Sequence, residues 1–331
     1  MTRKLAVVAG VVALLGAAAA VVSVRSIPAP PAVVLRTCMF PVQDFLPYFV
    51  MRERGLATRH GLRFEETTVP GGGAAIDGLA AGTLDVCPAI GFVPILAAAE
   101  RGVIPGRARV VAANDLTDPE HRTIAIVAAP NIKTVADLRG REIATNERGS
   151  ISAAAAAAWL QHEGVADVTF VKMSFANMGL AVAGGNVAAA TMNEPFLTQA
   201  IRRGDGHLLA WIAGGPPLAR APLTSIVVSV DLLQRRPDAV KAFLRAHLDA
   251  VGWISRNPDA TRQVLARSLD LSGDLGQHVH LARWPTDARN DAALIDGMQP
   301  VLVRAGLLKA PLPARSLYDE SLLEQVLAER R

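Results

Sequence analysis

Apolar segments of strand length alternate with helical patterns along most of the chain. In the first part, strands are predicted at 33–38, 63–69, 84–87, 109–114 and 123–128, and helices at 46–54, 74–81 and 92–101. Several of these strands are rich in β-branched residues, and glycine or proline separates many of the segments. Strands that alternate with helices are typical of a parallel sheet with helices on both faces. The pattern therefore predicts an α/β fold.

The same alternation begins again after residue 131. Strands are predicted at 142–145, 168–172 and 187–191, and helices at 152–163, 178–183 and 196–203. The segments Leu79–Cys87 (LAAGTLDVC) and Val182–Ala190 (VAGGNVAAA) show the recurrence directly, because in each a helix ends at glycine and a short strand follows. We therefore expect two similar three-layer α/β lobes rather than one continuous sheet.

The C-terminal third reads differently. A β-branched strand, Thr224–Val230, is expected to return the chain to the first lobe, and only helices are predicted after it. Pro237 and Pro258 stand at helix starts, where proline is favoured. Phe243 and Val251 belong to a set of apolar residues at helical spacing, which is typical of a core stripe. We expect this helical segment to pack on lobe 1.

The N-terminus has the features of a targeting segment. Arg3 and Lys4 precede an uncharged apolar run, and the small residues Ala17–Ala20 suit cleavage, so residues 1–26 are predicted to be a signal peptide. Because the run continues to Val24, a length that can span a bilayer, an uncleaved anchor is the alternative. Either one predicts export. Residues 27–32 are proline-rich and are expected to form a stiff linker.

Composition and charge exclude several functions. The chain has 331 residues, 51% of them hydrophobic, so it can bury substantial cores. Its formal net charge of +4 comes from scattered residues without a long basic run, which does not support nucleic-acid binding. No GK[ST] follows Gly71–Gly73, and there is no CxxC or zinc spacing. We expect no cofactor and no metal, because His278 and His280 lack the carboxylate spacing of a metal site.

The two cysteines allow two interpretations. Cys38 and Cys87 each lie at the end of a predicted strand in a chain expected to be exported, where disulfides persist. They are either two separate buried thiols or a bridge between neighbouring strands.

The segment around Gly149–Ser152 is a candidate binding element. Ser150 or Ser152 can cap the alanine-rich helix that follows, and Gly149 lets a ligand approach the backbone. The free amides and partial positive charge of a helix start suit an anion. The alternative is an ordinary capped helix packed on a sheet.

Short motifs spread over the chain resemble one known family. They are Arg54–Leu56 with His60–Leu62, Leu79–Asp85, Lys133–Ile143 (KTVADLRGREI), Asn193–Phe196 (NEPF) and the helix after Arg235–Asp238. In this order and spacing the chain resembles the periplasmic substrate-binding proteins of ABC importers for nitrate, sulfonate, taurine and thiamine precursors. Ala188 departs from that family, which often has Asp there.

The resemblance implies a two-lobed fold with a ligand cleft between the lobes and two crossover strands, near Arg122–Ala128 and Ala221–Ile226. Lobe 1 would comprise 33–125 and 224–331, and lobe 2 would comprise 126–223. The implied partners are a small-molecule ligand, an ABC permease and its ATPase. The chain would act as a monomer, with the membrane involved only through the signal or anchor. Ligands in such folds bind beyond the carboxyl ends of parallel strands.

Ligand-binding residues are expected from both lobes, because a closed cleft must be stabilised by contacts on both sides. Gln43 and Asn114 can donate and accept hydrogen bonds, although turn capping is their alternative role. The candidates are Phe40, Pro41, Gln43, Ile90, Gly91 and Asn114 from lobe 1, and Gly149, Ser150, Ile151, Asn177, Asn193 and Glu194 from lobe 2.

Glu194 carries the prediction about ligand chemistry. It matches Gly91 in the repeat and is expected to emerge into the cleft, where a carboxylate disfavours plain nitrate or alkanesulfonate. It would suit an amine-bearing or N–H heterocyclic ligand, taurine-like or pyrimidine-like. The alternative is that Glu194 caps the following helix.

Two rival functions remain open from the sequence. One is a ligand-sensing ectodomain that stays anchored through Leu5–Val24. The other is a hydrolase resembling the aromatic desulfinases, in which Cys38 would be the nucleophile; the histidine of those enzymes is missing at Gly73–Ile76, and a nucleophile needs a base. We therefore predict a binding protein without catalytic residues.

Overall fold

The structure is a computed structural model that describes residues 32–330. The predicted signal peptide or anchor at 1–26, and the linker apart from Ala32, lie outside the described residues. The described residues belong to one compact unit. Among them, no helix has the length and apolarity needed to cross a membrane.

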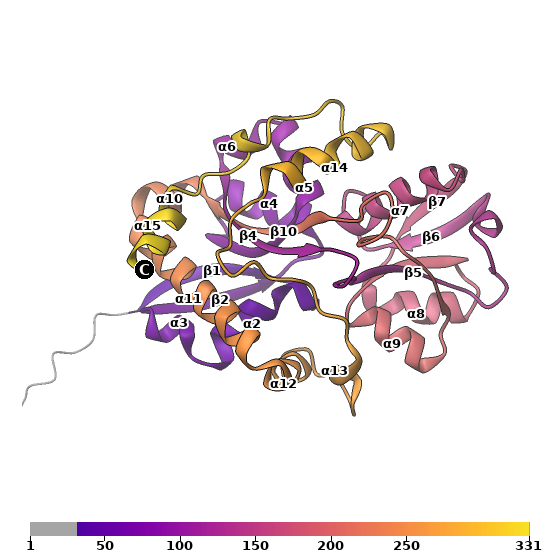
Figure 1. Cartoon of the computed structure of the whole chain (residues 1–331), viewed down its shortest axis with the longest axis horizontal. Helices are drawn as coiled ribbons and strands as arrows, with labels where there is room; N and C mark the ends of the chain where they lie inside the picture. The colour runs from indigo at the N-terminus through magenta and orange to yellow at the C-terminus, as the bar shows by residue number, and fades with distance from the viewer. Residues whose placement is uncertain (1–31, 331) are drawn as a thin grey trace, which may run out of the picture. The chain divides into compact units, whose positions relative to one another are not determined.

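The described chain forms two five-stranded sheets, one in each lobe (Figure 1). The first sheet has the order β2-β1-β3-β10-β4. Its strands are β1 (Val33–Met39), β2 (Leu62–Thr68), β3 (Val86–Gly91), β4 (Ala108–Thr117) and β10 (Ala221–Ser229). The second sheet has the order β7-β6-β8-β5-β9. Its strands are β5 (Ile124–Ala128), β6 (Arg141–Thr145), β7 (Val168–Lys172), β8 (Ala189–Asn193) and β9 (His207–Trp211).

The two sheets share one plan. In each, four of the five strands run in the same direction, and the fourth in spatial order runs antiparallel to its neighbours: β10 against β3 and β4, and β5 against β8 and β9. This confirms two similar lobes. Each predicted parallel sheet includes one antiparallel strand, because the strand that follows each crossing enters its sheet in the opposite direction.

The chain crosses between the sheets twice. It leaves the first sheet at Thr117 and enters the second at Ile124, then leaves at Trp211 and returns at Ala221. The lobe boundaries at 125/126 and 223/224 stay our proposal. Strand β9 was not predicted, because its sequence HLLAW has no β-branched residue and no clear alternation.

Helices cover both sheets. Those of the second lobe are α7 (Ile151–His162), α8 (Phe175–Ala183) and α9 (Phe196–Arg203). Those before the first crossing are α2 (Leu46–Glu53), α3 (Leu56–Arg59), α4 (Gly72–Ala80), α5 (Phe92–Glu100) and α6 (Val103–Gly106). Those after the return are α10 (Val230–Arg235), α11 (Pro237–Arg256), α12 (Pro258–Ser268), α13 (Leu275–His278), α14 (Ala292–Arg304) and α15 (Ser321–Glu329). Short 3-10 turns are η1 (Gln43–Phe45), η2 (Val135–Leu138) and η3 (Ala314–Ser316).

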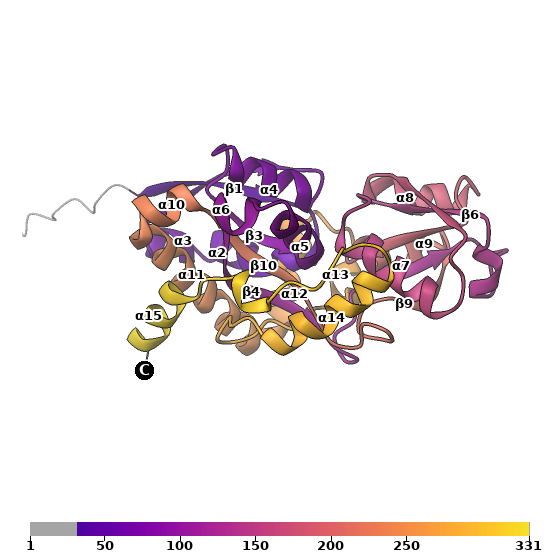
Figure 2. The same cartoon turned by 90° about the horizontal axis from the view of Figure 1, so that it is seen from above.

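The C-terminal helices pack on lobe 1, as predicted. Helix α11 lies along α2 and α15, and its buried Phe243 contacts Phe64 with ring centroids 5.8 Å apart. Helix α14 reaches further, to α7 of the second lobe (Figure 2). There Gln161 Nε2 donates a hydrogen bond to the Arg304 carbonyl at 2.8 Å. The C-terminal segment therefore contacts both lobes.

Cys38 and Cys87 form a disulfide, with a Cα–Cα distance of 5.0 Å. They lie on adjacent strands, since β1 pairs with β3 at Thr37 and Val86. Both are fully buried. Of the two interpretations of the cysteines, the bridge between neighbouring strands is confirmed.

Candidate functional site

A cavity of about 530 Å³ lies between the two lobes. Each lobe lines it with the loops that follow three parallel strands: β1, β2 and β3 from the first lobe, and β6, β7 and β8 from the second. Carboxyl ends of parallel strands are where α/β sheets bind ligands. The volume is in the range of small-molecule sites.

Much of the cavity wall is apolar. Phe175 and Phe196 of the second lobe stack on each other, with ring centroids 5.4 Å apart and an interplanar angle of 14°. Phe40, Val69 and Pro70 line the side of the first lobe. These surfaces suit a ligand with an apolar or aromatic body.

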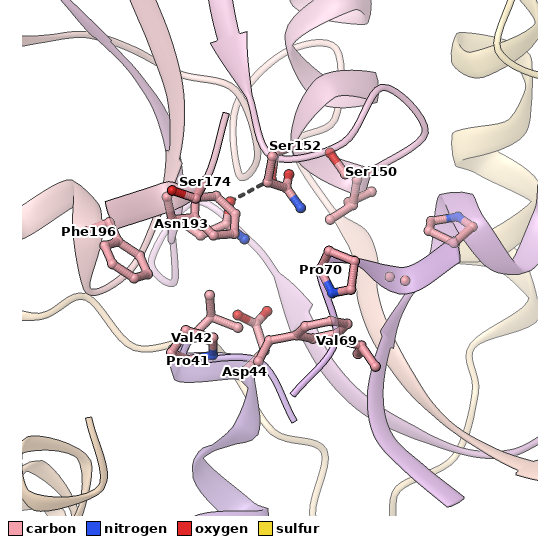
Figure 3. A pocket seen from close by; sticks show the side chains of 18 of the residues that line it. Pro41, Val42, Asp44, Val69, Pro70, Ser150, Ser152, Ser174, Asn193 and Phe196 are labelled. Carbon is pink, nitrogen blue, oxygen red and sulfur yellow. Dashed lines mark hydrogen bonds between the residues drawn. The ribbon is translucent and has the colours of Figure 1, made fainter. Parts of the chain in front are cut away.

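The second lobe contributes the start of helix α7. Ser150 is its N-cap, and Ser150 Oγ accepts a hydrogen bond from Ala153 N at 3.1 Å. Ser152 Oγ donates to Asn193 Oδ1 at 2.5 Å, as the dashed line in Figure 3 marks. The first amides of a helix have no partner within it. This wall therefore offers hydroxyl, amide and backbone donors.

The first lobe contributes an acid. Asp44, in η1, is 4% exposed and lines the cavity opposite Ser152 and Asn193 (Figure 3). Asn114 Nδ2 donates to the Asp44 carbonyl at 2.9 Å and to Thr224 Oγ1 at 2.8 Å. Thr224 Oγ1 in turn donates to Asp115 Oδ1. Asp44 and Asp115 are thus two buried acids connected by a polar network at the cavity.

Burial raises the pKa of both acids. The pKa of Asp115 is raised further by the charge of Asp44. Of the two acids, Asp115 is therefore the one whose protonated form the site favours more strongly.

The structure brings part of the predicted set together at the cavity. Its members in the lining are Phe40, Pro41, Gly91, Ser150, Ile151 and Asn193. The others lie outside the lining. Gly149 and Asn177 are exposed on the surface, and Ile90 is buried in the core. Asn114 lies behind Asp44 and Thr224, to which it is bonded. Gln43 is fully buried, and its Oε1 accepts from Ala282 N at 3.0 Å.

Glu194 does not line the cavity, so the structure does not support the argument for ligand chemistry that rested on it. Its carboxylate accepts from Thr198 N at 3.2 Å, Thr198 Oγ1 at 2.7 Å and His280 N at 3.1 Å. Its carbonyl accepts from Gln43 N at 3.0 Å, which joins the two lobes. Asn193, the last residue of β8, lines the cavity, whereas Glu194 in the following loop is bonded to Thr198 of α9. Burial raises the pKa of Glu194 to about 7.

The profile of the NMT1-like family matches residues 28–270 of the chain. The chain belongs to the NMT1-like family. A search of curated proteins finds no significant match.

Solved structures share the fold of this NMT1-like chain. The nitrate-binding protein NrtA from Synechocystis PCC 6803 aligns with a TM-score of 0.71 and 17% identity, over 91% of this chain and 89% of that one. The alkanesulfonate-binding protein SsuA from Xanthomonas axonopodis pv. citri, bound to MOPS, aligns with a TM-score of 0.66 and 21% identity, over 90% of this chain and 99% of that one. The desulfurization enzyme DSZB aligns with a TM-score of 0.61 and 19% identity, over 90% of this chain and 99% of that one.

Several lining residues of the NMT1-like chain were not predicted. Val69–Gly72 and Lys172–Ala176 follow the second strand of each lobe, and Asp44 lies three residues beyond Pro41. The rule that strand ends bind ligands applies to these loops as well, but none of their residues was predicted, and after the strand 168–172 only Asn177 was chosen. Further lining residues that were not predicted are Val42, Pro94, Asn146, Phe196 and Thr224.

The described part of the NMT1-like chain contains neither a free cysteine nucleophile at Cys38 nor a cluster of side chains that could hold a metal ion. The Cys38 thiol is bound in the disulfide, so it is not available as a nucleophile. Within residues 32–330, no three His, Cys, Asp or Glu side chains gather where they could hold a metal ion. His278 Nε2 instead pairs with Asp274 at 2.9 Å, and the His280 ring packs against Trp211.

Proposed function

We propose that this chain is the extracytoplasmic solute-binding component of an ABC importer, which captures a small organic ligand between its lobes and delivers it to a permease driven by an ATPase. The observation that carries this proposal is the cavity, since three strand-end loops from each lobe enclose it. The names of two neighbours in fold, a nitrate-binding and an alkanesulfonate-binding protein, agree with it.

The proposed mechanism is closure of the lobes on the ligand. The crossings at 118–123 and 212–220 join the lobes and are the segments about which they would move. A ligand that contacts both walls binds the closed form more tightly, and this difference in affinity shifts the population to that form. The permease would then recognise the closed molecule.

We propose a taurine-like or pyrimidine-like ligand as the class of solute. The stacked Phe175 and Phe196 favour a ligand with an apolar or planar body, and Ser150 and Asn193 provide hydrogen-bond donors and acceptors. A bare inorganic anion would leave most of a 530 Å³ cavity unfilled. The protein would act as a monomer that does not bind nucleic acid.

A sensing ectodomain is the second candidate. It is favoured by one observation, the uncharged run of 5–24, which would hold the folded part at the membrane if it were not cleaved. N-terminal sequencing of the full chain expressed in a Gram-negative bacterium separates the two. A new N-terminus near residue 26 in the periplasmic fraction supports the importer component, and an intact N-terminus in the membrane fraction supports the anchored sensor.

Ligand capture tests the binding function itself. The secreted protein is unfolded in denaturant to strip bound solutes, refolded, and mixed with sulfonates, amines and aminopyrimidines, and complexes are read by native mass spectrometry. We expect one-to-one complexes that weaken at least tenfold in Asn193→Ala, because Asn193 lines the cavity, and that persist in Asn177→Ala, which changes an exposed residue outside it. Equal binding by both variants would contradict the assigned site.

A further inference from the structure

Asp44 is a buried acid with an unused acceptor at the cavity. Its side chain is 4% exposed, and Oδ2 has no hydrogen-bond partner in the described structure. The residue nevertheless lines the cavity and lies across from Asn193 (Figure 3). A buried carboxylate oxygen without a donor is costly, so such an oxygen at a ligand cavity is explained when the ligand supplies the donor.

Asp115 does not supply the positive charge that would balance an ionised Asp44. Its Oδ1 accepts from Thr224, and the hydrogen bond between the two carboxyl groups, which lowers the pKa of Asp44 and raises that of Asp115, can only share a proton. Neither acid forms an ion pair with a Lys, Arg or His among residues 32–330. The described part of the protein therefore places no cation where it could balance a negative charge on this pair.

The opposite wall has the complementary character. Ser150 Oγ accepts from Ala153 N, so its own proton is free to donate. Ser152 Oγ donates its hydrogen bond to Asn193 Oδ1. The Asn193 amide nitrogen forms no hydrogen bond within the described residues, so it is free to donate. Lys172, at the edge of this wall, is exposed and cationic. The wall with Asp44 therefore offers hydrogen-bond acceptors, and the opposite wall offers hydrogen-bond donors.

We propose that the cavity takes a small organic cation, a primary ammonium or an amidinium, whose charged group lies against Asp44 while an acceptor group at its other end faces Ser150 and Asn193. This rests on the proposed binding function and narrows it. A plain nitrate or alkanesulfonate has no group that could balance the charge of Asp44. A taurine-like zwitterion and an aminomethyl heterocycle both have one.

Three matched probes test this inference: 4-(aminomethyl)benzamide, 4-(hydroxymethyl)benzamide and 4-carboxybenzamide, which share an acceptor end and differ in charge. The same three groups on a pyrimidine ring form a second set. Dissociation constants are measured by calorimetry at pH 8 on the full secreted protein, on Asp44→Asn and on Asp77→Asn, which removes an exposed acid of α4 in the same lobe.

We expect the cation to bind about ten- to a hundredfold more tightly than the neutral and anionic analogues, with this preference lost in Asp44→Asn and kept in Asp77→Asn. The wild-type comparison stands even if Asp44→Asn does not fold. Tighter binding of an anion, or a cation preference that survives Asp44→Asn, would overturn the inference and leave the binding function in place. Failure of the wild-type protein to bind these probes or any solute of the capture experiment would overturn the binding function.

Discussion

Asp44 and Glu194 occupy comparable places in the two lobes, each in a loop that follows a parallel strand ending at the cavity. Both are buried, and burial raises the pKa of each. They differ in their partners. The Glu194 carboxylate accepts three hydrogen bonds from Thr198 and His280, whereas Asp44 Oδ2 accepts none. An acid whose acceptors are filled by the protein holds segments together, and an acid with an open acceptor at a cavity is available to a ligand.

The loops that carry these acids are also held differently. The Asp44 loop continues from β1, which the Cys38–Cys87 disulfide links to β3. The corresponding strands of the second lobe, β6 and β8, contain no cysteine. There Glu194 itself joins α9 to the segment at His280 and, through its carbonyl, to Gln43. The Asp44 loop is thus held by a disulfide, whereas Glu194 itself makes the hydrogen bonds that hold its loop.

The largest effect is expected from removing the disulfide in the double variant Cys38→Ala/Cys87→Ala. A bridge across 49 residues of sequence constrains the unfolded chain, and its loss should cost about 4 kcal/mol of the free energy of unfolding. Urea unfolding measures the loss, and reductant should destabilise the wild type but not the variant. Hydrogen exchange should rise in β1 and β3 and stay unchanged in β6 and β8. Equal loss of protection in both sheets would refute a framework confined to the first lobe.

The next effect separates the two acids by stability. Glu194→Ala leaves the amides of Thr198 and His280 without an acceptor, so we expect a loss of about 3 kcal/mol. Asp44→Asn removes a charge that has no partner, so the variant should stay within about 1 kcal/mol of the wild type or exceed it. Urea midpoints of the two variants and the wild type measure both. A larger loss of stability in Asp44→Asn than in Glu194→Ala would contradict the structural role given to Glu194 and the binding role given to Asp44.

The pH dependence of stability gives a smaller effect. The pKa of Glu194 is raised from 4.5 to about 7, so between these values the folded chain holds a proton that the unfolded chain has lost. Its contribution to the free energy of unfolding is therefore present below about pH 4.5 and falls as pH rises toward 7, by up to about 3 kcal/mol. Glu194→Gln cannot ionise, and the stability difference between wild type and variant should fall over this range.

The difference between the two proteins is the proper measure because other groups titrate in the same window. Burial lowers the pKa of His247 to about 4, which makes stability rise with pH up to the unfolded value of 6.5 and opposes Glu194. This contribution is common to wild type and Glu194→Gln and cancels. A difference that stays flat from pH 4.5 to 7 would show that Glu194 is ionised throughout.

Local signals in the sequence were enough for much of the fold and part of the site. The strand-helix alternation and the repeat at Leu79 and Val182 predicted two lobes, because both depend on patterns within a few residues. A cap at Ser150 or Ser152 was predicted for the same reason, since capping needs only the residue and the first turn after it, and the structure has it at Ser150. Strand β9, which has no such pattern, was missed.

The roles of the acids could not be predicted in this way. The repeat placed Glu194 at a strand end, but Asn193, the last residue of β8, lines the cavity, and the Glu194 carboxylate is bonded to Thr198 and His280, which only the folded chain brings to it. Asp44 was passed over because its character depends on Asp115 and Thr224, which lie about 70 and 180 residues away in the sequence and meet it only after folding. Only the tertiary structure says which acceptors the protein fills.

The smallest effect concerns a third acid, Glu147 of the second lobe, whose Oε2 also has no partner. It differs from Asp44 because it rests against the glycines that begin α4 in the first lobe. A Cβ at Gly71 would lie 2.0 Å from Glu147 Oε2, and one at Gly73 would lie 2.7 Å from Oε1. Gly71 has an extended backbone with φ of −179°, so alanine meets no backbone strain there. The cost of Gly71→Ala must come from displacing Glu147.

We expect that cost to be about 1 kcal/mol, because the end of a glutamate side chain can move aside. In a Glu147→Ala background, Gly71→Ala should be nearly neutral, so a double-mutant cycle from urea unfolding should give a coupling of about 1 kcal/mol. Gly149→Ala, at an exposed glycine with no neighbour within 4 Å of an added Cβ, is the control and should show no coupling to Glu147→Ala. Additive effects of Gly71→Ala and Glu147→Ala would mean that Glu147 does not rest on α4 in solution. The missing partner of Glu147 Oε2 would then be explained by lobes that stand further apart. In that case a missing hydrogen-bond partner would no longer identify Asp44 as a ligand contact, and only ligand-binding measurements could do so.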